Sequence, residues 1–170
     1  VTIAEIARVA DVAVQTVFNH FATKEELFFD GRTPWLDAPA QAVRGRDASV
    51  SALSALRVHL VAAVHDLIDA HSCPQSRRYI QTLEGSETLR AYERELLHAS
   101  EQRLRATLLE AWEADAARGM PVPGDPGIIT TLTAALWLAT VRSVVADQRP
   151  ALAQGADPAR AADVASDLAD

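Results

Sequence analysis

The stretch that decides the fold is VAVQTVFNHFATKEEL, residues 12–27. Apolar side chains recur in it three to four residues apart, which is the spacing of one helix face; they are Val14, Val17, Phe18 and Phe21. The polar side chains between them fall on the other side: Gln15, Thr16, Asn19 and His20. We therefore predict a short helix from Ala13 to about Phe21, with a buried stripe and a polar outer face.

The residues before this stretch predict a supporting helix and a tight turn. Thr2 and Glu5 have the spacing of a capping box, in which a hydroxyl and a carboxylate each satisfy a backbone amide. The apolar positions that follow at helical spacing are Ile3, Ile6, Ala7 and Ala10. Asp11 stands where the chain must turn, and Asp tolerates left-handed backbone better than most residues. Two short helices with a tight turn and a polar second face are what a reader of the DNA major groove requires.

These residues resemble the DNA-binding region of the TetR family of transcriptional regulators. The family pattern is met at Thr2, Ile6, Ala7, Ala10, Val12, Thr16, Val17, Phe18, His20, Phe21, Lys24 and Leu27. The resemblance implies an all-α, TetR-like fold with two domains. Residues 1–30 are expected to be a helix-turn-helix DNA-binding domain, and 31–170 a helical ligand-binding and dimerisation domain. The family has a further helix before Thr2, so we expect the first domain to be incomplete at its N-terminus.

Three residues depart from the family pattern. Asp11 stands where a glycine is usual. Ala13 replaces the usual serine cap, and the loss of such a cap costs about 1 kcal/mol. Phe18 replaces the usual tyrosine and so lacks a hydroxyl that contacts phosphate. The second and third departures predict weaker DNA binding.

The resemblance also implies roles for individual residues. The side chains placed near phosphates are Thr2, Thr16, Phe18, His20 and Lys24. Those placed nearest the base edges are Ala13, Val14, Gln15 and Asn19. Gln15 and Asn19 are the best candidates for reading bases, because a side-chain amide can pair with adenine in the major groove. Ordinary packing stays open as an alternative for Phe18, Phe21 and His20.

Composition limits the other classes of function. The 170 residues carry a net charge of −7, which taken alone disfavours nucleic acid because phosphate contacts need Lys and Arg. Residues 1–29 hold Arg8 and Lys24 against four acidic side chains, but local placement matters more than the total charge. Cys73 is the one cysteine, so an intrachain disulfide is impossible and a reducing, cytoplasmic location is favoured.

Helical periodicity continues beyond the first domain. A third helix beginning at Lys24 is expected to break near Gly31–Pro34 and to resume through Trp35 to about Val43, because proline removes a backbone donor. After a loop at 44–49, one apolar stripe is expected at Leu53, Leu56, Leu60, Val64, Leu67 and Ile68. A short helix from Gln75 to Leu83 precedes the longest one, which is expected from about Ser86 to Arg118 with Gly119 as its C-cap.

The last part of the chain predicts a homodimer. Asp125–Pro126 is a helix start, and residues 128–141 contain no charge but are too few to span a membrane, which takes about 20 residues. We expect Ile129, Leu132 and Leu136 on one side of this helix and Leu138, Val141 and Val145 on another. A helix with no polar face must be covered all round, in part by a second subunit. Asp157–Pro158 starts a final helix. The expected interface residues are Leu132, Leu136, Leu138, Val141, Val145, Val164 and Leu168.

The resemblance implies a small, largely apolar effector within the helical body, and double-stranded DNA with a palindromic operator as the other partner. Candidate lining residues are Trp35, Leu60, Val64, His65, Tyr79, Leu83, Trp112 and Trp137, and each also suits plain core packing. The effector is expected to favour a body shape in which the two DNA-binding units no longer match the half-site spacing. No cofactor and no membrane is implied. A metal site at His59, His65 and His71 is rejected, because a spacing of six does not place neighbours on one helix face.

Two other classes stay open. An enzyme on a helical bundle would need a nucleophile with its base, metal-ligand spacing or a glycine-rich phosphate loop, and the sequence has none of these. A helical small-molecule sensor or scaffold with weakened or lost DNA binding fits the acidic first domain and the missing serine cap. DNA binding by the protein is the observation that separates these classes.

Overall fold

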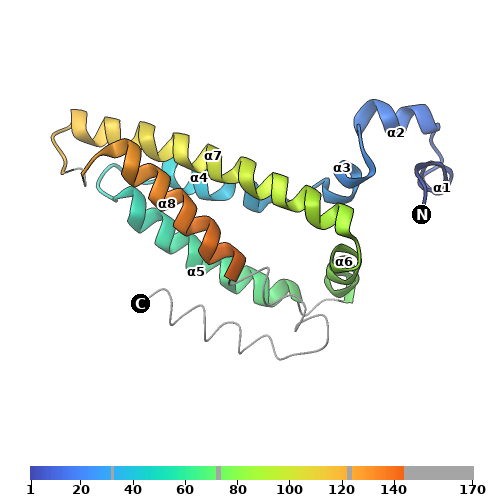
Figure 1. Cartoon of the computed structure of the whole chain (residues 1–170). Helices are drawn as coiled ribbons and strands as arrows, with labels where there is room; N and C mark the ends of the chain where they lie inside the picture. The colour runs from blue at the N-terminus through green and yellow to red at the C-terminus, as the bar shows by residue number, and fades with distance from the viewer. Residues whose placement is uncertain (32, 72–73, 122–123, 144–170) are drawn as a thin grey trace. The chain divides into compact units, whose positions relative to one another are not determined.

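A computed structural model describes residues 1–31, 33–71, 74–121 and 124–143. Over these residues every regular element is a helix, which confirms the all-α class (Figure 1). The chain divides into two compact units, Val1–Pro34, here called the head, and Trp35–Asp170, here called the body. None of the described helices is both long enough and apolar enough to cross a lipid bilayer.

The head contains three short helices, α1 (Ile3–Val9), α2 (Val14–His20) and α3 (Lys24–Phe29). The predicted capping box begins α1: the Glu5 amide donates to Thr2 Oγ1 at 3.2 Å, and the Thr2 amide donates to Glu5 Oε2 at 2.6 Å. Asp11 makes the turn to α2 with a φ of 54°, the left-handed backbone expected of it. These local signals therefore fix where α1 begins and where the chain turns into α2.

Thr23 and Glu26 repeat the spacing of Thr2 and Glu5 and predict a second capping box, from which the start of α3 differs in one detail. Thr23 Oγ1 accepts from the Glu26 amide at 3.0 Å, as expected. The Glu26 carboxylate, however, accepts from the amide of Ala22 at 2.7 Å, one residue before the cap. A glutamate side chain is long enough to reach either amide, so spacing alone does not select its partner.

The predicted break after α3 is confirmed. The helix ends at Phe29, Gly31 has a φ of 64°, and the chain resumes as a short 3₁₀ turn, η1 (Pro34–Leu36). The body helices that follow are α4 (Ala38–Arg44), α5 (Ala52–His71), α6 (Pro74–Glu84), α7 (Glu87–Ala117) and α8 (Pro126–Val141).

The body is organised around α7. Helices α4 and α8 both pack along it, and α6 packs against it as well (Figure 1). The buried cluster at the centre contains Val43, Ala52, Leu56, Leu104, Leu108, Ala111, Trp112 and Ala134, with Ile129 and Trp137 packed against it. Because α7 supplies four residues to this cluster and contacts each of the other body helices, it is the structural axis of the body.

Two expected apolar stripes need correction. Leu53 is exposed although Leu56, one turn later, is buried; Leu60 is half-buried, and the side chains of Val64, Leu67 and Ile68 lie outside the described residues. In α8, Ile129 packs against the core cluster while Leu132 and Leu136 are exposed, so these three do not share one environment. A periodic pattern identifies a helix, but it does not fix which way the helix is rotated in the fold.

The rotation of α8 follows from its small residues. Thr130, Ala134 and Trp137 recur at helical spacing; the first two are buried and Trp137 is packed on the core. Small side chains let α8 approach α7 closely, and the buried Thr130 hydroxyl donates to the Gly127 carbonyl at 3.1 Å. The opposite side of α8 therefore carries Leu132 and Leu136 outward. The predicted helix after Asp157–Pro158 lies outside the described residues.

Candidate nucleic-acid interface

Helix α2 exposes most of its circumference. Val17 is its one buried residue, with 7% of its surface accessible. At 100° per residue, the side chains of Gln15 and Asn19 lie opposite Val17 and therefore point away from the packed side of the helix. The two amides that the sequence singles out as base readers are accordingly at the most outward position of α2.

The outward amides are flanked by two different stripes. On one side lie Val14 and Phe18, which are 41% and 50% exposed. On the other side lie Thr16 and His20, both exposed. The expectation that Val14 and Phe18 belong to a buried stripe is wrong, because α2 packs on α1, a helix of seven residues that covers little beyond Val17.

The two amides are joined to each other. Gln15 Nε2 donates to Asn19 Oδ1 at 3.1 Å across one turn of the helix. This bond restrains two side chains that would otherwise rotate freely, so less conformational entropy is lost when either contacts a base. Asn19 keeps both of its N–H donors and Gln15 keeps its carbonyl oxygen for a partner.

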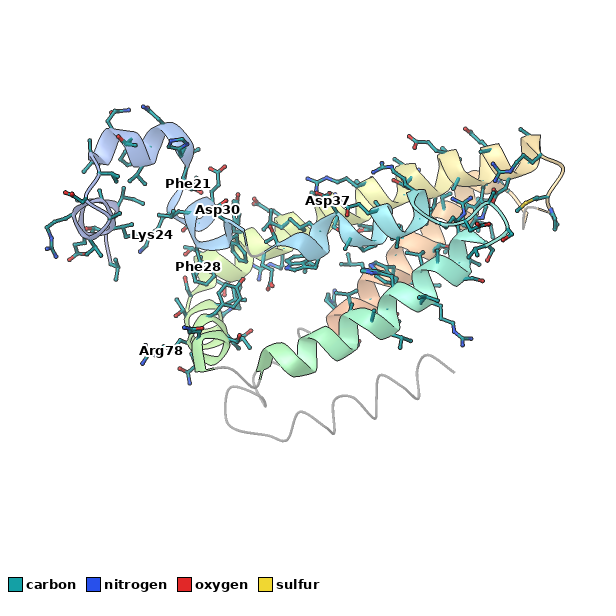
Figure 2. The ribbon with its side chains drawn as sticks, turned by 180° about the vertical axis from the view of Figure 1, so that it is seen from behind. Phe21, Lys24, Phe28, Asp30, Asp37 and Arg78 are labelled. Carbon is teal, nitrogen blue, oxygen red and sulfur yellow. The ribbon has the colours of Figure 1, made fainter. Side chains whose placement is uncertain are left out.

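All nine residues predicted to contact DNA are exposed: Thr2, Ala13, Val14, Gln15, Thr16, Phe18, Asn19, His20 and Lys24. Ala13 occupies the N-cap of α2 and makes no side-chain capping bond, as its missing hydroxyl requires. Lys24 lies in the first turn of α3, at the place marked in Figure 2. Exposure makes these contacts sterically possible and does not by itself assign any of them to DNA.

Thr2 is the least suited of the nine to bind a phosphate. Its hydroxyl accepts from the Glu5 amide and donates to Glu5 Oε2 at 3.1 Å. Hydrogen bonds from the Thr2 backbone and hydroxyl hold the pKa of the Glu5 carboxyl below its usual value, so Glu5 is ionised at neutral pH. A phosphate approaching Thr2 would meet this negative charge.

The residues predicted to line an effector site fall into separate parts of the body. Trp112 is buried in the core cluster, and Trp137 packs against that cluster with its ring stacked on His59, the centroids 5.7 Å apart. Leu60 follows His59 on α5 and is half-buried. Tyr79 and Leu83 lie on α6, which joins the start of α7 through Gly85.

These positions do not surround one small cavity. Trp112 lies roughly 38 Å along the axis of α7 from its first residue, at 1.5 Å per residue. Leu83 is fully buried beside that first turn, where the Ser86 amide donates to its carbonyl at 3.2 Å. Trp35 is half-buried in η1, and the side chains of Val64 and His65 lie outside the described residues. A small effector could therefore contact only one subset of the candidates.

The predicted dimer residues are also distributed unevenly. Leu132 and Leu136 are 54% and 67% exposed, and Leu138 and Val141 are half-buried. Val145, Val164 and Leu168 lie outside the described residues. Ile128 is exposed one turn before Leu132 and was not among the predicted residues, although its spacing of four to Leu132 was the signal that could have identified it.

Comparison with protein families matches residues 1–30 to bacterial regulatory proteins of the tetR family. The matched segment contains α1, α2 and α3, and so includes the exposed face described above. Comparisons with curated proteins and with solved structures gave no match. The match supports a role in transcription regulation through a DNA-binding helix-turn-helix. This N-terminal segment is therefore similar to the tetR family of bacterial regulatory proteins.

Proposed function

We propose that this protein represses transcription by binding a palindromic operator as a homodimer, and that a small, largely apolar molecule bound in the body releases the DNA. The observation that carries the DNA-binding part is the exposed face of α2, where Gln15 and Asn19 lie opposite the one buried residue. The side-chain amides are the groups that pair with adenine in the major groove.

Phosphate contacts in this proposal come from the polar flank of α2 and from the start of α3. Thr16 and His20 lie together on one side of the amides, and Lys24 is an exposed cation a few residues further on. Lys24 is the one Lys or Arg among these proposed contacts, so counterion release is expected to be modest and the affinity to depend weakly on salt compared with that of strongly basic DNA-binding proteins. The head thus relies more on base contacts than on charge.

Dimerisation in this proposal uses the outward side of α8. Ile128, Leu132 and Leu136 recur every four residues and are all more than half exposed. Leucine and isoleucine at such spacing form a continuous apolar strip, which is stabilised when a second copy covers it. A two-fold dimer would place two α2 helices against the two halves of a palindromic site.

The effector part rests on the stacked rings of Trp137, near the C-terminal end of α8, and His59 on α5. Trp137 is half-buried and stacks on His59, so this part of the body presents flat apolar surface beside a polar ring nitrogen. Mostly apolar sites with a few polar groups are typical of small-molecule pockets. The effector acts by preferring one body shape over another, which shifts the population away from the DNA-binding state. We place this activity in the cytoplasm.

The DNA-binding part is tested by selecting bound sequences from a pool of randomised duplexes and measuring affinity for the enriched duplex. Gln15→Ala is expected to weaken binding about tenfold, in the range of one lost bidentate base contact. Lys24→Ala is expected to weaken binding to all duplexes similarly and to reduce the salt dependence by about one ion. Val58→Ala, an exposed change on α5, is the matched control and should leave the affinity unchanged.

Specific binding that survives both Gln15→Ala and Lys24→Ala would contradict these contacts. If no duplex is enriched, the alternative function is favoured: a helical sensor or scaffold that has lost DNA binding. The uncapped N-terminus of α2 at Ala13 is the observation that favours this alternative, because the recognition helix lacks one stabilising bond.

A further inference from the structure

The outward surface of α2 has an unusual chemical composition for a helix that reads DNA. The helix contains no Lys, Arg, Asp or Glu. Its outward amides, Gln15 and Asn19, are flanked on one side by the exposed apolar pair Val14 and Phe18 and on the other by Thr16 and His20. Guanine is most often read by Arg or Lys, so α2 lacks the cationic side chains that most often contact a G·C pair.

The apolar pair is continuous. Val14 and Phe18 are one helical turn apart on the same side of α2 and leave 41% and 50% of their surfaces accessible. Exposed apolar groups gain free energy only from an apolar partner. In the major groove, the C5-methyl group of thymine is the apolar group that the base edges present, and apolar side chains contact it.

The amides of Gln15 and Asn19 favour adenine, the base that pairs with thymine. The bond from Gln15 Nε2 to Asn19 Oδ1 uses one N–H of Gln15 and leaves its second N–H, its carbonyl oxygen and both Asn19 N–H groups for other partners. An amide reads adenine by donating to N7 and accepting from the N6 amino group. The amides would contact adenine, and the apolar pair would contact thymine methyl groups. Together these contacts favour adjacent A·T pairs under α2.

We propose that Val14 is a specificity-determining residue, and that with Phe18 it selects thymine through its methyl group, so that each operator half-site carries A·T pairs under α2. This inference rests on the proposed DNA-binding function. It adds the class of sequence recognised and assigns Phe18 to the bases, in place of the phosphate contact that the family resemblance implied.

The test replaces thymine by uracil, which removes one methyl group and leaves the hydrogen-bonding edge unchanged. A duplex is first selected from the randomised pool, and each of its thymines is then replaced singly. At one or more positions, uracil is expected to weaken binding by the wild-type protein about fourfold, which is the ~0.8 kcal/mol of one buried methylene-sized group. Because the change is made in the DNA, it cannot disturb folding of the protein.

The methyl contact is assigned to Val14 by combining the uracil substitution in the DNA with Val14→Ala in the protein. In the Val14→Ala variant, uracil at the sensitive position is expected to weaken binding less than about twofold, because the apolar partner of the methyl group is gone. The Val58→Ala control should keep the full fourfold effect. The uracil effect is also expected to persist as salt is raised, unlike that of Lys24→Ala, because an apolar contact is not screened.

The outcomes distinguish failure of the thymine-methyl contact from failure of the proposed DNA-binding function. If the protein enriches a duplex and every thymine tolerates uracil, the methyl contact is refuted while DNA binding stands. An enriched site whose α2-contacted pairs are G·C has the same consequence. If no duplex is enriched at all, the proposed function itself fails. Uracil sensitivity that Val14→Ala leaves intact would overturn the assignment to Val14.

Discussion

At the scale of single residues, Arg46 connects three segments of the body. Its guanidinium donates to the Val43 carbonyl at 2.8 Å, to the Val50 carbonyl at 3.1 Å and to Asp115 Oδ1 at 2.9 Å. The carboxylate of Asp115 is buried and is also paired with Arg118. One side chain thus joins the end of α4, the loop before α5 and the last turns of α7.

Arg46→Ala is expected to lower the free energy of unfolding by about 2 kcal/mol, because removing one partner leaves a buried carboxylate short of a charge. This loss is smaller than is usual for removing one partner of a buried ion pair, because Arg118 still pairs with Asp115. Urea denaturation followed by circular dichroism measures the change.

Arg103→Ala is the matched control for this prediction. Arg103 pairs with Asp37 at 2.6 Å, with both side chains about half exposed (Asp37 is marked in Figure 2). An exposed pair is worth at most about 1 kcal/mol, since water screens it. Equal effects of the two substitutions would contradict the importance given to the buried pair.

At the scale of secondary-structure elements, the helices differ in how well their first turns are satisfied. Asp125 caps α8 by accepting from the Ile128 amide at 3.0 Å, and Ser86 caps α7 by accepting from the Leu89 amide at 3.4 Å. Helix α2 has no such side-chain bond, although Ala13 has an extended backbone, with φ −67° and ψ 143°, that suits a capping residue. The element proposed to contact DNA is therefore held less firmly at its start.

Ala13→Ser is expected to stabilise α2 by about 1 kcal/mol, because the new hydroxyl would accept one of the free amides at the start of the helix. Amide hydrogen exchange in α2 should slow about fivefold. Ala4→Ser, within α1, is the control and should not stabilise, since serine is a poorer helix former than alanine. Unchanged or faster exchange in α2 would show that its first turn is already satisfied in another way.

At the scale of the whole molecule, the outward side of α8 is one apolar surface that the described part of the chain leaves uncovered. Ile128, Leu132 and Leu136 are exposed on a helix whose described residues carry no charge before Arg142. Exposed apolar side chains also occur on α5, at Leu53 and Val58. The regular spacing along α8 is what distinguishes a strip that a second copy could cover from scattered exposed residues.

The wild-type protein is expected to be a dimer at micromolar concentration by light scattering. Leu136→Glu should weaken the dimer about 100-fold or more, because association would bury an unpaired carboxylate. Val58→Glu places the same charge on a residue that is 70% exposed on α5 and should leave the dimer intact. A monomeric wild-type protein, or equal dissociation by both variants, would refute the α8 interface.

The similarity of residues 1–30 to the tetR family and the order of the elements could be predicted from the sequence because their signals are local. The capping box at Thr2, the left-handed turn at Asp11 and the break near Gly31 each depend on residues within about four positions of one another. The exposure of Gln15 and Asn19 also follows, because their spacing places them away from the apolar side of a helix.

Tertiary structure decided which apolar faces are covered and which distant residues meet. Val14 and Phe18 have the spacing of a core stripe, yet they are exposed because α1 covers only the side of α2 that carries Val17. The rotation of α8 was set by close packing of Thr130 and Ala134, and Arg46 meets a partner 69 positions away in Asp115. Sequence periodicity is a property of one helix, whereas burial depends on what packs against it, and that is settled only when the whole chain folds.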